Sequence, residues 1–407
     1  MQFNFFFPIF LLFSIFWHTS EAKDNINGLD YLNSIRGKVG LVPLTSNKAL
    51  IRAATSHAKY LTRQQVNSHY ETTGYKGFSG KTPSDRVIQA GYHSRVVMEN
   101  ISVNGRNVVA AIDNLMSAIY HRFTFLTMDK DEIGEGISIL PTRRVKVTTA
   151  YVYDLGFSGL KNICKKYFSM EPGMRYIKNI CRKSTKVIPE YMYIDALNTL
   201  KKQNEKIVLY PYDTQENISP AFFIENPHPL PGSKVSGFPV SVSFNDAYVQ
   251  NVSLISFRLF DSTGHEIKQR KILTYKNDIH HKITQYQFAF MPLKRLDYSS
   301  TYKAVFEAIV DGEKIHKTWS FSTIHPQKKM YKITKKKTIL SVEKGTKILL
   351  YFEPKSKRDI LKNIKYKGNL QIKYIDPNTL EVTLPNKVSR KIYSISESTR
   401  KIILKLL

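Results

Sequence analysis

The sequence has little cysteine, two among 407 residues, and few acids, with 33 Asp or Glu against 61 Lys or Arg. Two cysteines exclude a disulfide-framework scaffold and any zinc module built from several cysteines. Beyond the N-terminal segment, the chain has no uninterrupted apolar run of 18 residues, so no later segment is expected to span a bilayer. The shortage of acids leaves a formal charge of +28, which favours an anionic partner without identifying it.

The remaining composition is that of a folded protein. Apolar residues make up 42% and aromatic residues 12%, which excludes a disordered chain. The length predicts two or three domains, each large enough to bury its own core.

The N-terminal segment has the pattern of an export signal. Residues 3–17 are almost wholly apolar, and they run into Ser20-Glu21-Ala22, a small-x-small sequence ahead of Lys23. This pattern predicts a signal peptide over residues 1–22, and hence a secreted, periplasmic or cell-envelope protein. Because no Lys or Arg precedes the apolar run, an uncleaved membrane anchor stays open as an alternative.

Export changes the interpretation of the two cysteines. In an oxidising compartment Cys164 and Cys181 are expected to form a disulfide, and two free thiols in a reduced protein are the alternative. The disulfide would close a loop of 18 residues. In the chain-entropy model, closing a loop of that length contributes about 3 kcal/mol to stability.

The secondary structure that the sequence pattern predicts changes along the chain. Residues 23–160 mix helical and strand patterns, which predicts an α+β layered domain. Residues 161–232 are expected to be a connector that contains the disulfide loop. Short β-branched and aromatic runs over 233–325 predict an Ig-like β-sandwich, and 326–407 is again strand-like.

Two local motifs give sharper predictions. Thr82-Pro83-Ser84-Asp85 has a capping residue followed by proline, which predicts the start of a helix. Asp311-Gly312 lies between two strand-like runs and predicts a β-hairpin.

The positive charge is unevenly distributed. Residues 326–407 carry a net +15 in 82 residues, against +6 for 23–160 and +8 for 161–325. A solvated basic face is the plain interpretation of the C-terminal module. The alternative is a surface for an anionic envelope polymer or a membrane, and after the signal peptide nucleic acid ranks behind these partners.

The N-terminal domain resembles a known family through a series of short motifs in a fixed order. They are Leu32-Asn33, Gly40-Leu41, His57-Ala58-x-Tyr60-Leu61, Ser68-His69, Gly77-Phe78-x-Gly80, Asp85-Arg86, Gly91-Tyr92, Glu99-Asn100-Ile101, Tyr120-His121-Arg122 and Gly134-x-Gly136. Together they are similar to the bacterial branch of the CAP superfamily, which includes cysteine-rich secretory proteins, antigen-five allergens and pathogenesis-related proteins. The resemblance covers about a third of the chain.

The resemblance implies an α-β-α sandwich with a cleft lined by two histidines and two acids. His69 matches the first histidine, Glu99 the first glutamate, and His121 the histidine of the bacterial His-Arg motif. The second glutamate is missing, because Ala118 occupies the matching position, and Glu71 is a candidate to replace it. The cleft residues implied in this way are His69, Glu71, Glu99, Asn100, His121 and Arg122.

These residues permit three kinds of chemistry. The imidazoles of His69 and His121 can bind zinc or another divalent metal, or act as acid and base, or simply form a polar wall of a binding groove. His57 lies in an alanine-rich helical stripe and is interpreted as a core histidine. The Gly-x-Ser-x-Gly elbow, the His-Glu-x-x-His helix and the phosphate loop are absent from the sequence.

Two functional hypotheses follow. The first is an exported, non-enzymatic binding protein whose cleft takes a lipid or other small apolar ligand, and whose basic module holds it on an anionic envelope polymer. The second is a secreted metal-dependent hydrolase of a peptide or envelope polymer that uses His69, Glu99 and His121. The missing glutamate and the absent nucleophile motif weigh against the second.

Overall fold

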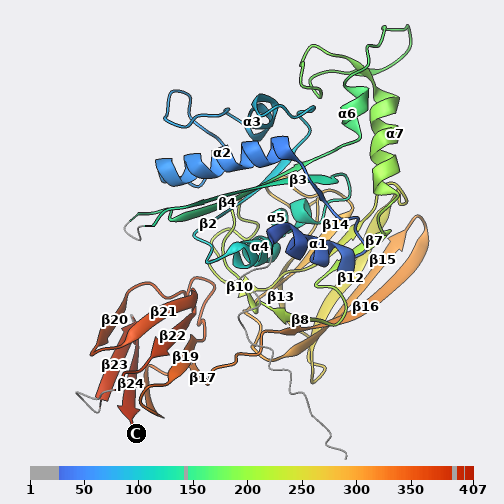
Figure 1. The fold of residues 1–407 in the computed structure, drawn as a ribbon. Coiled ribbons are helices and arrows are strands. Elements are labelled where there is room, and N and C mark those ends of the chain that lie inside the picture. The colour runs from blue at the N-terminus through green and yellow to red at the C-terminus, as the bar shows by residue number, and fades with distance from the viewer. Residues whose placement is uncertain (1–26, 142–144, 387–391, 398) are drawn as a thin grey trace, which may run out of the picture.

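A computed structural model describes residues 27–141, 145–386, 392–397 and 399–407 of the chain. The predicted signal peptide lies outside these residues. Within the described part of the chain, no helix is long and apolar enough to cross a membrane. The chain forms an N-terminal α+β domain followed by several β-sheets (Figure 1).

The N-terminal domain is a four-stranded sheet between two layers of helices. Helices α2 and α3 lie on one face, and α1, α4 and α5 lie on the other (Figure 1). The strands run in the order β1-β3-β4-β2. The helices are α1 (Gly28–Lys38), α2 (Lys48–Gln64), α3 (Pro83–Gln89), α4 (Val108–Ser117) and α5 (Ile119–Phe125), and the strands are β1 (Thr45–Ser46), β2 (Met98–Val103), β3 (Glu132–Ile139) and β4 (Thr149–Gly156).

Local sequence explains two features of this domain. Thr82 and Asp85 form a reciprocal capping box with Pro83 in the first turn, which confirms the predicted start of α3. Gly134 and Gly136 face α2, and a Cβ at either position would lie 2.0–2.1 Å from its backbone. These glycines therefore allow the longest helix of the domain to pack directly on β3.

A disulfide segment, residues 160–189, follows β4. Cys164 and Cys181 form the predicted disulfide, with their Cα atoms 5.5 Å apart. The segment contains α6 (Leu160–Ile163) and the pair β5 (Tyr176–Ile177) and β6 (Ile188–Pro189), and helix α7 (Glu190–Lys201) leads out of it.

The middle domain, residues 207–323, consists of two four-stranded sheets that pack face to face. Phe257 of one sheet and Phe290 of the other have ring centroids 5.9 Å apart. The strand orders are β13-β14-β11-β7 and β12-β15-β16-β8. The strands are β7 (Ile207–Tyr210), β8 (Gln215–Ile218), β11 (Val240–Phe244), β12 (Val252–Asp261), β13 (Gln269–Leu273), β14 (Gln287–Pro292), β15 (Thr301–Val310) and β16 (Glu313–Thr323), and β9 (Ala221–Phe222) pairs separately with β10 (Ser236–Gly237).

The middle domain begins earlier than the sequence predicted. Strands β7 and β8 lie within the expected connector, yet each completes one of the two sheets. Both strands have only four residues, too few for a clear period-two pattern, and the nearby prolines suggested a linker. The hairpin at Asp311-Gly312 is confirmed: both residues have positive φ and join β15 directly to β16.

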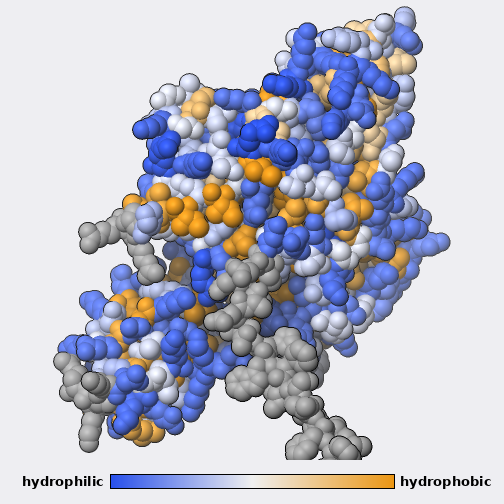
Figure 2. Space-filling model, in the orientation of Figure 1, coloured by the Kyte–Doolittle hydropathy of each residue, from blue (hydrophilic) through white to orange (hydrophobic). Residues whose placement is uncertain are grey.

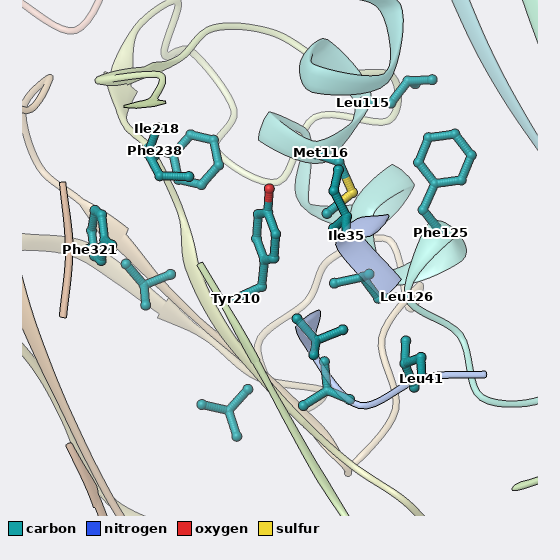
Figure 3. Packing of buried hydrophobic residues seen from close by; sticks show 14 of the residues in the cluster. Ile35, Leu41, Leu115, Met116, Phe125, Leu126, Tyr210, Ile218, Phe238 and Phe321 are labelled. Carbon is teal, nitrogen blue, oxygen red and sulfur yellow. The ribbon is translucent and has the colours of Figure 1, made fainter. Parts of the chain in front are cut away.

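The N-terminal and middle domains share one hydrophobic core. Buried residues of α1, α4 and α5 pack in the same cluster as those of the middle domain. Figure 3 shows Tyr210 and Phe238 beside Ile35 and Met116 at this junction. The chain length had suggested that each domain encloses its own core. These two domains instead share one.

The C-terminal module, residues 326–407, is β-rich as predicted and has its own core. Its two sheets have the orders β17-β19-β22-β21 and β18-β24-β23-β20. Arg295 joins it to the middle domain through two hydrogen bonds, of 2.9 and 2.8 Å, to the carboxylate of Asp376. The strands are β17 (Met330–Ile333), β18 (Lys337–Val342), β19 (Lys347–Phe352), β20 (Ile364–Lys367), β21 (Gln371–Asp376), β22 (Thr379–Thr383), β23 (Ile392–Glu397) and β24 (Arg400–Leu406).

Candidate functional site

A cleft of about 540 Å³ contains both histidines that the family resemblance singled out. His69 comes from the loop after α2, and His121 comes from α5. Segment 222–226 and Pro377 of the C-terminal module also line the cleft. All three folded regions therefore contribute to its wall.

His69 is held by a buried ion-pair network. Its Nδ1 atom lies 2.8 Å from Oε1 of Glu99, and Arg86 donates from Nη2 to Oε2 of the same carboxylate at 2.5 Å. The side chains of Arg86 and Glu99 are 0% and 1% exposed, whereas that of His69 is 38% exposed. Burial alone would raise the pKa of Glu99, but the His69 hydrogen bond and the charge of Arg86 outweigh it and lower this pKa.

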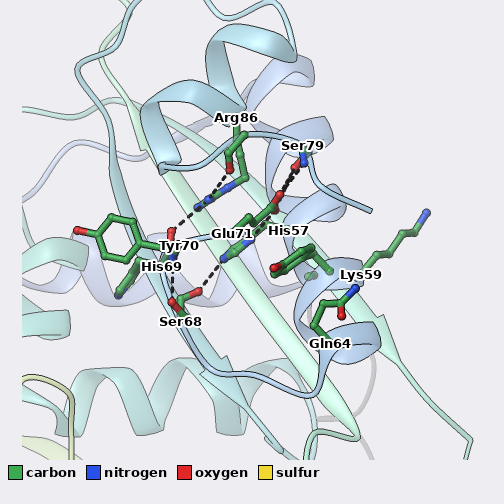
Figure 4. A network of polar contacts seen from close by, with 12 residues as sticks. His57, Lys59, Gln64, Ser68, His69, Tyr70, Glu71, Ser79 and Arg86 are labelled. Carbon is green, nitrogen blue, oxygen red and sulfur yellow. Dashed lines mark hydrogen bonds and ion pairs between the residues drawn. The ribbon is translucent and has the colours of Figure 1, made fainter. Parts of the chain in front are cut away.

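A second carboxylate lies behind this pair. His57 faces Oε1 of Glu71 through Nδ1 at 2.8 Å and the carbonyl of Ser68 through Nε2 at 3.0 Å (Figure 4). Ser79 donates to Glu71 from its backbone N–H at 2.5 Å. His57 is fully buried and hydrogen-bonded, as predicted, and it fixes the loop that carries His69.

Asp154 is a further member of this network, and the sequence analysis did not single it out. It lies on β4 directly opposite Glu99 on β2 and is fully buried. Among the described residues, Glu99 is the side chain that shares a hydrogen bond with it, and no N–H group donates to either of its carboxyl oxygens. Burial, followed by the negative charge of Glu99, raises the pKa of Asp154 well above its usual value, which favours the neutral acid at neutral pH.

His121 is paired with an acid from outside the N-terminal domain. Its Nδ1 atom lies 3.0 Å from Oε2 of Glu225, which is 6% exposed. The same carboxylate accepts hydrogen bonds from the backbone N–H groups of Ile119 and Tyr120, at 2.8 and 3.1 Å. Because Ala118 provides no side-chain cap, Glu225 caps the N-terminus of α5.

Glu225 is the acid that pairs with His121, and the sequence motifs do not point to it. Sequence reasoning missed it because it falls in the expected connector, more than 100 positions from His121 along the chain. Its sequence context carries no signal that could have indicated the pairing.

The other expected cleft residues lie behind its wall or away from it. Glu71 is buried beneath the His69 loop, and Asn100 is buried with its Nδ2 donating to the carbonyl of His121 at 2.9 Å. Arg122 is fully buried on the opposite side of α5, where it donates to the carbonyl of Pro239 at 2.7 Å. Its guanidinium lies 4.9 and 4.7 Å from the ring centroids of Tyr210 and Phe238. Arg122 thus joins the two domains rather than lining the cleft, because its planar cation can stack and hydrogen-bond in that junction.

The cleft residues do not fit a zinc centre. No group of three or more His, Cys, Asp or Glu side chains able to hold a metal ion occurs among the residues with described positions. A catalytic zinc site uses three protein ligands, and here each cleft imidazole already has its Nδ1 atom against a carboxylate. What the arrangement provides is two oriented imidazoles in a partly apolar cleft.

Comparison with known proteins addresses the N-terminal domain. Residues 29–153 match the family model described as the cysteine-rich secretory protein family, CAP. A search of curated proteins finds no match.

Several solved bacterial structures are similar over about a third of the chain. An extracellular protein containing an SCP domain from Bacillus anthracis is 21% identical, with 32% of this chain and 39% of that chain covered and a TM-score of 0.27. An outer surface protein from Borrelia burgdorferi is 19% identical, with coverages of 32% and 88% and a TM-score of 0.27. A cysteine-rich secretory protein from Staphylococcus aureus is 18% identical, with coverages of 33% and 38% and a TM-score of 0.20.

The match therefore concerns one part of the molecule. This chain spans well under half the length of the first of these structures. The family model begins just inside α1 and ends within β4, so it covers the sheet and helices that carry His69, Glu99 and His121. Residues 29–153 form a domain of the cysteine-rich secretory protein (CAP) family.

Proposed function

We propose that this protein binds a small apolar ligand in the His69–His121 cleft without transforming it. The observation that carries the proposal is the pairing of each cleft imidazole, through Nδ1, with a buried carboxylate. In the described structure no protein group hydrogen-bonds to Nε2 of either ring, and in this proposal these two atoms make the polar contacts with the ligand. A binding cleft typically combines apolar walls with a few placed polar groups. The apolar lining here includes Ile101, Val103, Leu115, Phe222 and Phe223.

The remaining parts of the proposal concern location and attachment. The disulfide supports export, because disulfides persist in oxidising compartments. In the proposed role, the Ig-like middle domain is a spacer and the C-terminal module attaches the protein to envelope polyanions. The net charge of +15 on residues 326–407 supports that attachment.

One observation favours a second function, a hydrolase. The His69–Glu99 pair has the geometry of a general base and its orienting carboxylate. In this alternative His69 activates a water molecule and His121 polarises the substrate.

Native mass spectrometry of the protein purified from its own envelope tests the binding function. We expect a bound apolar species that is lost in Ser117→Trp, because Ser117 lines the cleft and tryptophan would fill it. Ser262→Trp is the matched control, since Ser262 is exposed in a turn of the middle domain. A wild-type protein with no bound species would contradict the proposal. Hydrolysis of an envelope polymer that His69→Ala abolishes would favour the second function.

The attachment is tested with the full chain and anionic vesicles or polyanions. Lys335, Lys336 and Lys337 are exposed, so changing all three to Gln should weaken binding. The same change at the exposed Lys276, Lys282 and Lys317 of the middle domain should have a smaller effect. Equal retention at about 50 and 500 mM salt would contradict electrostatic attachment, because salt screens exposed charges.

A further inference from the structure

A larger cavity lies outside the CAP cleft, beside the disulfide. Its volume is about 870 Å³, at the upper end of the roughly 300–1,000 Å³ usual for ligand sites. One rim comes from α6 and the turn after it, and the other comes from the residues after Cys181. The disulfide joins the two rims, and this part of the chain projects beside α2 and α7 in Figure 1.

The cavity is lined by cations and contains no acidic side chain. Its five charged lining residues are Lys161, Lys165, Arg182, Lys183 and Lys186. None of the five forms an ion pair with a carboxylate in the part of the chain that the structure covers. Glu132, an acid outside the lining, accepts hydrogen bonds from the lining residues Tyr92 and Asn47 through its two oxygens, at 2.6 and 2.8 Å.

The charge of this segment is local. Residues 160–189 carry eight Lys or Arg and one Glu, whereas residues 190–325 carry fifteen Lys or Arg and fourteen Asp or Glu. Nearly all of the excess charge between the CAP domain and the C-terminal module therefore lies in this segment, and five of its eight cations line the cavity. Hydrophilic side chains are prominent on this projecting part in Figure 2. Like charges held together repel each other, and a bound anion would relieve that repulsion.

The rims of the cavity are fixed in place. The N–H of Arg182 donates to the carbonyl of His93 at 2.9 Å, and the N–H of Arg95 donates to the carbonyl of Ile180 at 2.8 Å. Lys186 donates from Nζ to the carbonyl of Cys164 at 2.5 Å. These contacts tie the backbone of both rims to each other and to the CAP domain, and they fix the ammonium group of Lys186.

Aromatic side chains complete the lining. Tyr167 is 89% exposed, and Lys186 Nζ lies 4.5 Å from the centroid of its ring. Phe168 and Tyr92 also line the cavity. Flat rings beside ammonium groups suit a ligand that has both a ring scaffold and anionic substituents.

We propose that this cavity is a second ligand site, which takes a sugar-sized polyanion bearing at least two separated sulfate, phosphate or carboxylate groups. We expect the ligand to carry two separated anionic groups because the cavity has cations on both of its rims. The site is independent of the CAP cleft, and its ligand is a molecule small enough to enter the cavity rather than a membrane surface.

The test uses calorimetry of the full chain with sucrose octasulfate, with inositol hexakisphosphate as the phosphate counterpart and sucrose as the neutral control. Changing Lys165 and Lys183, one on each rim, to Gln should weaken binding about ten-fold, the equivalent of 1.4 kcal/mol. The matched control changes Lys166 and Lys178 to Gln; both are exposed in the same segment but outside the cavity lining. This control should weaken binding less than about two-fold. Bound ligand should also protect Lys165 and Lys183 from acetylation.

Three results would overturn the proposal. Equal weakening by the two double variants would mean that only the general positive field attracts the anion. Failure of both polyanions to bind would exclude the site. Binding to anionic vesicles that K165Q/K183Q reduces, without any binding of the soluble polyanions, would assign the surface to a membrane instead.

Discussion

The two His–Glu pairs of the cleft differ in origin. His69 and Glu99 both belong to the CAP domain, and Arg86 of the same domain balances the charge of Glu99. His121 belongs to the CAP domain too, but Glu225 belongs to the middle domain, in the segment between β9 and β10. The first pair is part of a buried charge network, whereas the second is formed by capping a short helix. One side of the cleft is thus intrinsic to the CAP domain, and the other depends on how the next domain docks.

The largest expected effect comes from breaking the intrinsic pair. Glu99→Gln removes the charge that compensates Arg86, and an uncompensated buried charge costs about 3–5 kcal/mol of unfolding free energy. Denaturant unfolding measures this loss. The control is Asp154→Asn at the facing position, where an amide replaces a carboxyl that is already neutral, so the expected change is less than about 1 kcal/mol. Equal losses in both variants would contradict the assigned charge states.

The buried acids around His69 predict a dependence of stability on pH. The folded-state pKa values of Glu99 and Glu71 are lowered from 4.5, so their stabilisation is present above that pH and is lost as the pH falls through the lowered values. Asp154 has the opposite sign: its raised pKa destabilises the fold as the pH rises through the raised value. In acid titrations of stability, Glu99→Gln should flatten the low-pH loss, and an unchanged slope would count against the network.

The interdomain pair should give the smallest effect. Glu225→Ala removes the cap of α5 and the partner of His121, and loss of a cap typically costs about 0.5–2 kcal/mol. Glu225→Gln keeps an oxygen acceptor and should retain most of that stability. Thermal unfolding of the two variants makes the comparison. A loss as large as that of Glu99→Gln would mean that Glu225, too, compensates a buried charge.

Much of the CAP domain was predictable, because its signals are local. The capping box at Thr82 depends on residues close in sequence, and so do two predicted features outside this domain, the hairpin at Asp311 and the disulfide. The ordered motifs also identified His69, Glu99 and His121, and the structure places both histidines in one cleft. Arg122 was also predicted to line that cleft, because it follows His121 in the sequence. Adjacent helical residues point about 100° apart, and Arg122 accordingly lies in the domain junction.

The amino-acid sequence was sufficient to establish the order of α+β and β-rich regions, the family of residues 29–153 and the concentration of charge at the C-terminus. These properties follow from composition, short motifs and periodicity, which need no knowledge of long-range contacts. Tertiary packing was needed to show that Glu225 partners His121, that β7 and β8 join the middle domain, and that the cations around the disulfide line one cavity. The physical reason is that each of these features joins residues that are distant in sequence, and packing of the whole chain sets which distant groups meet.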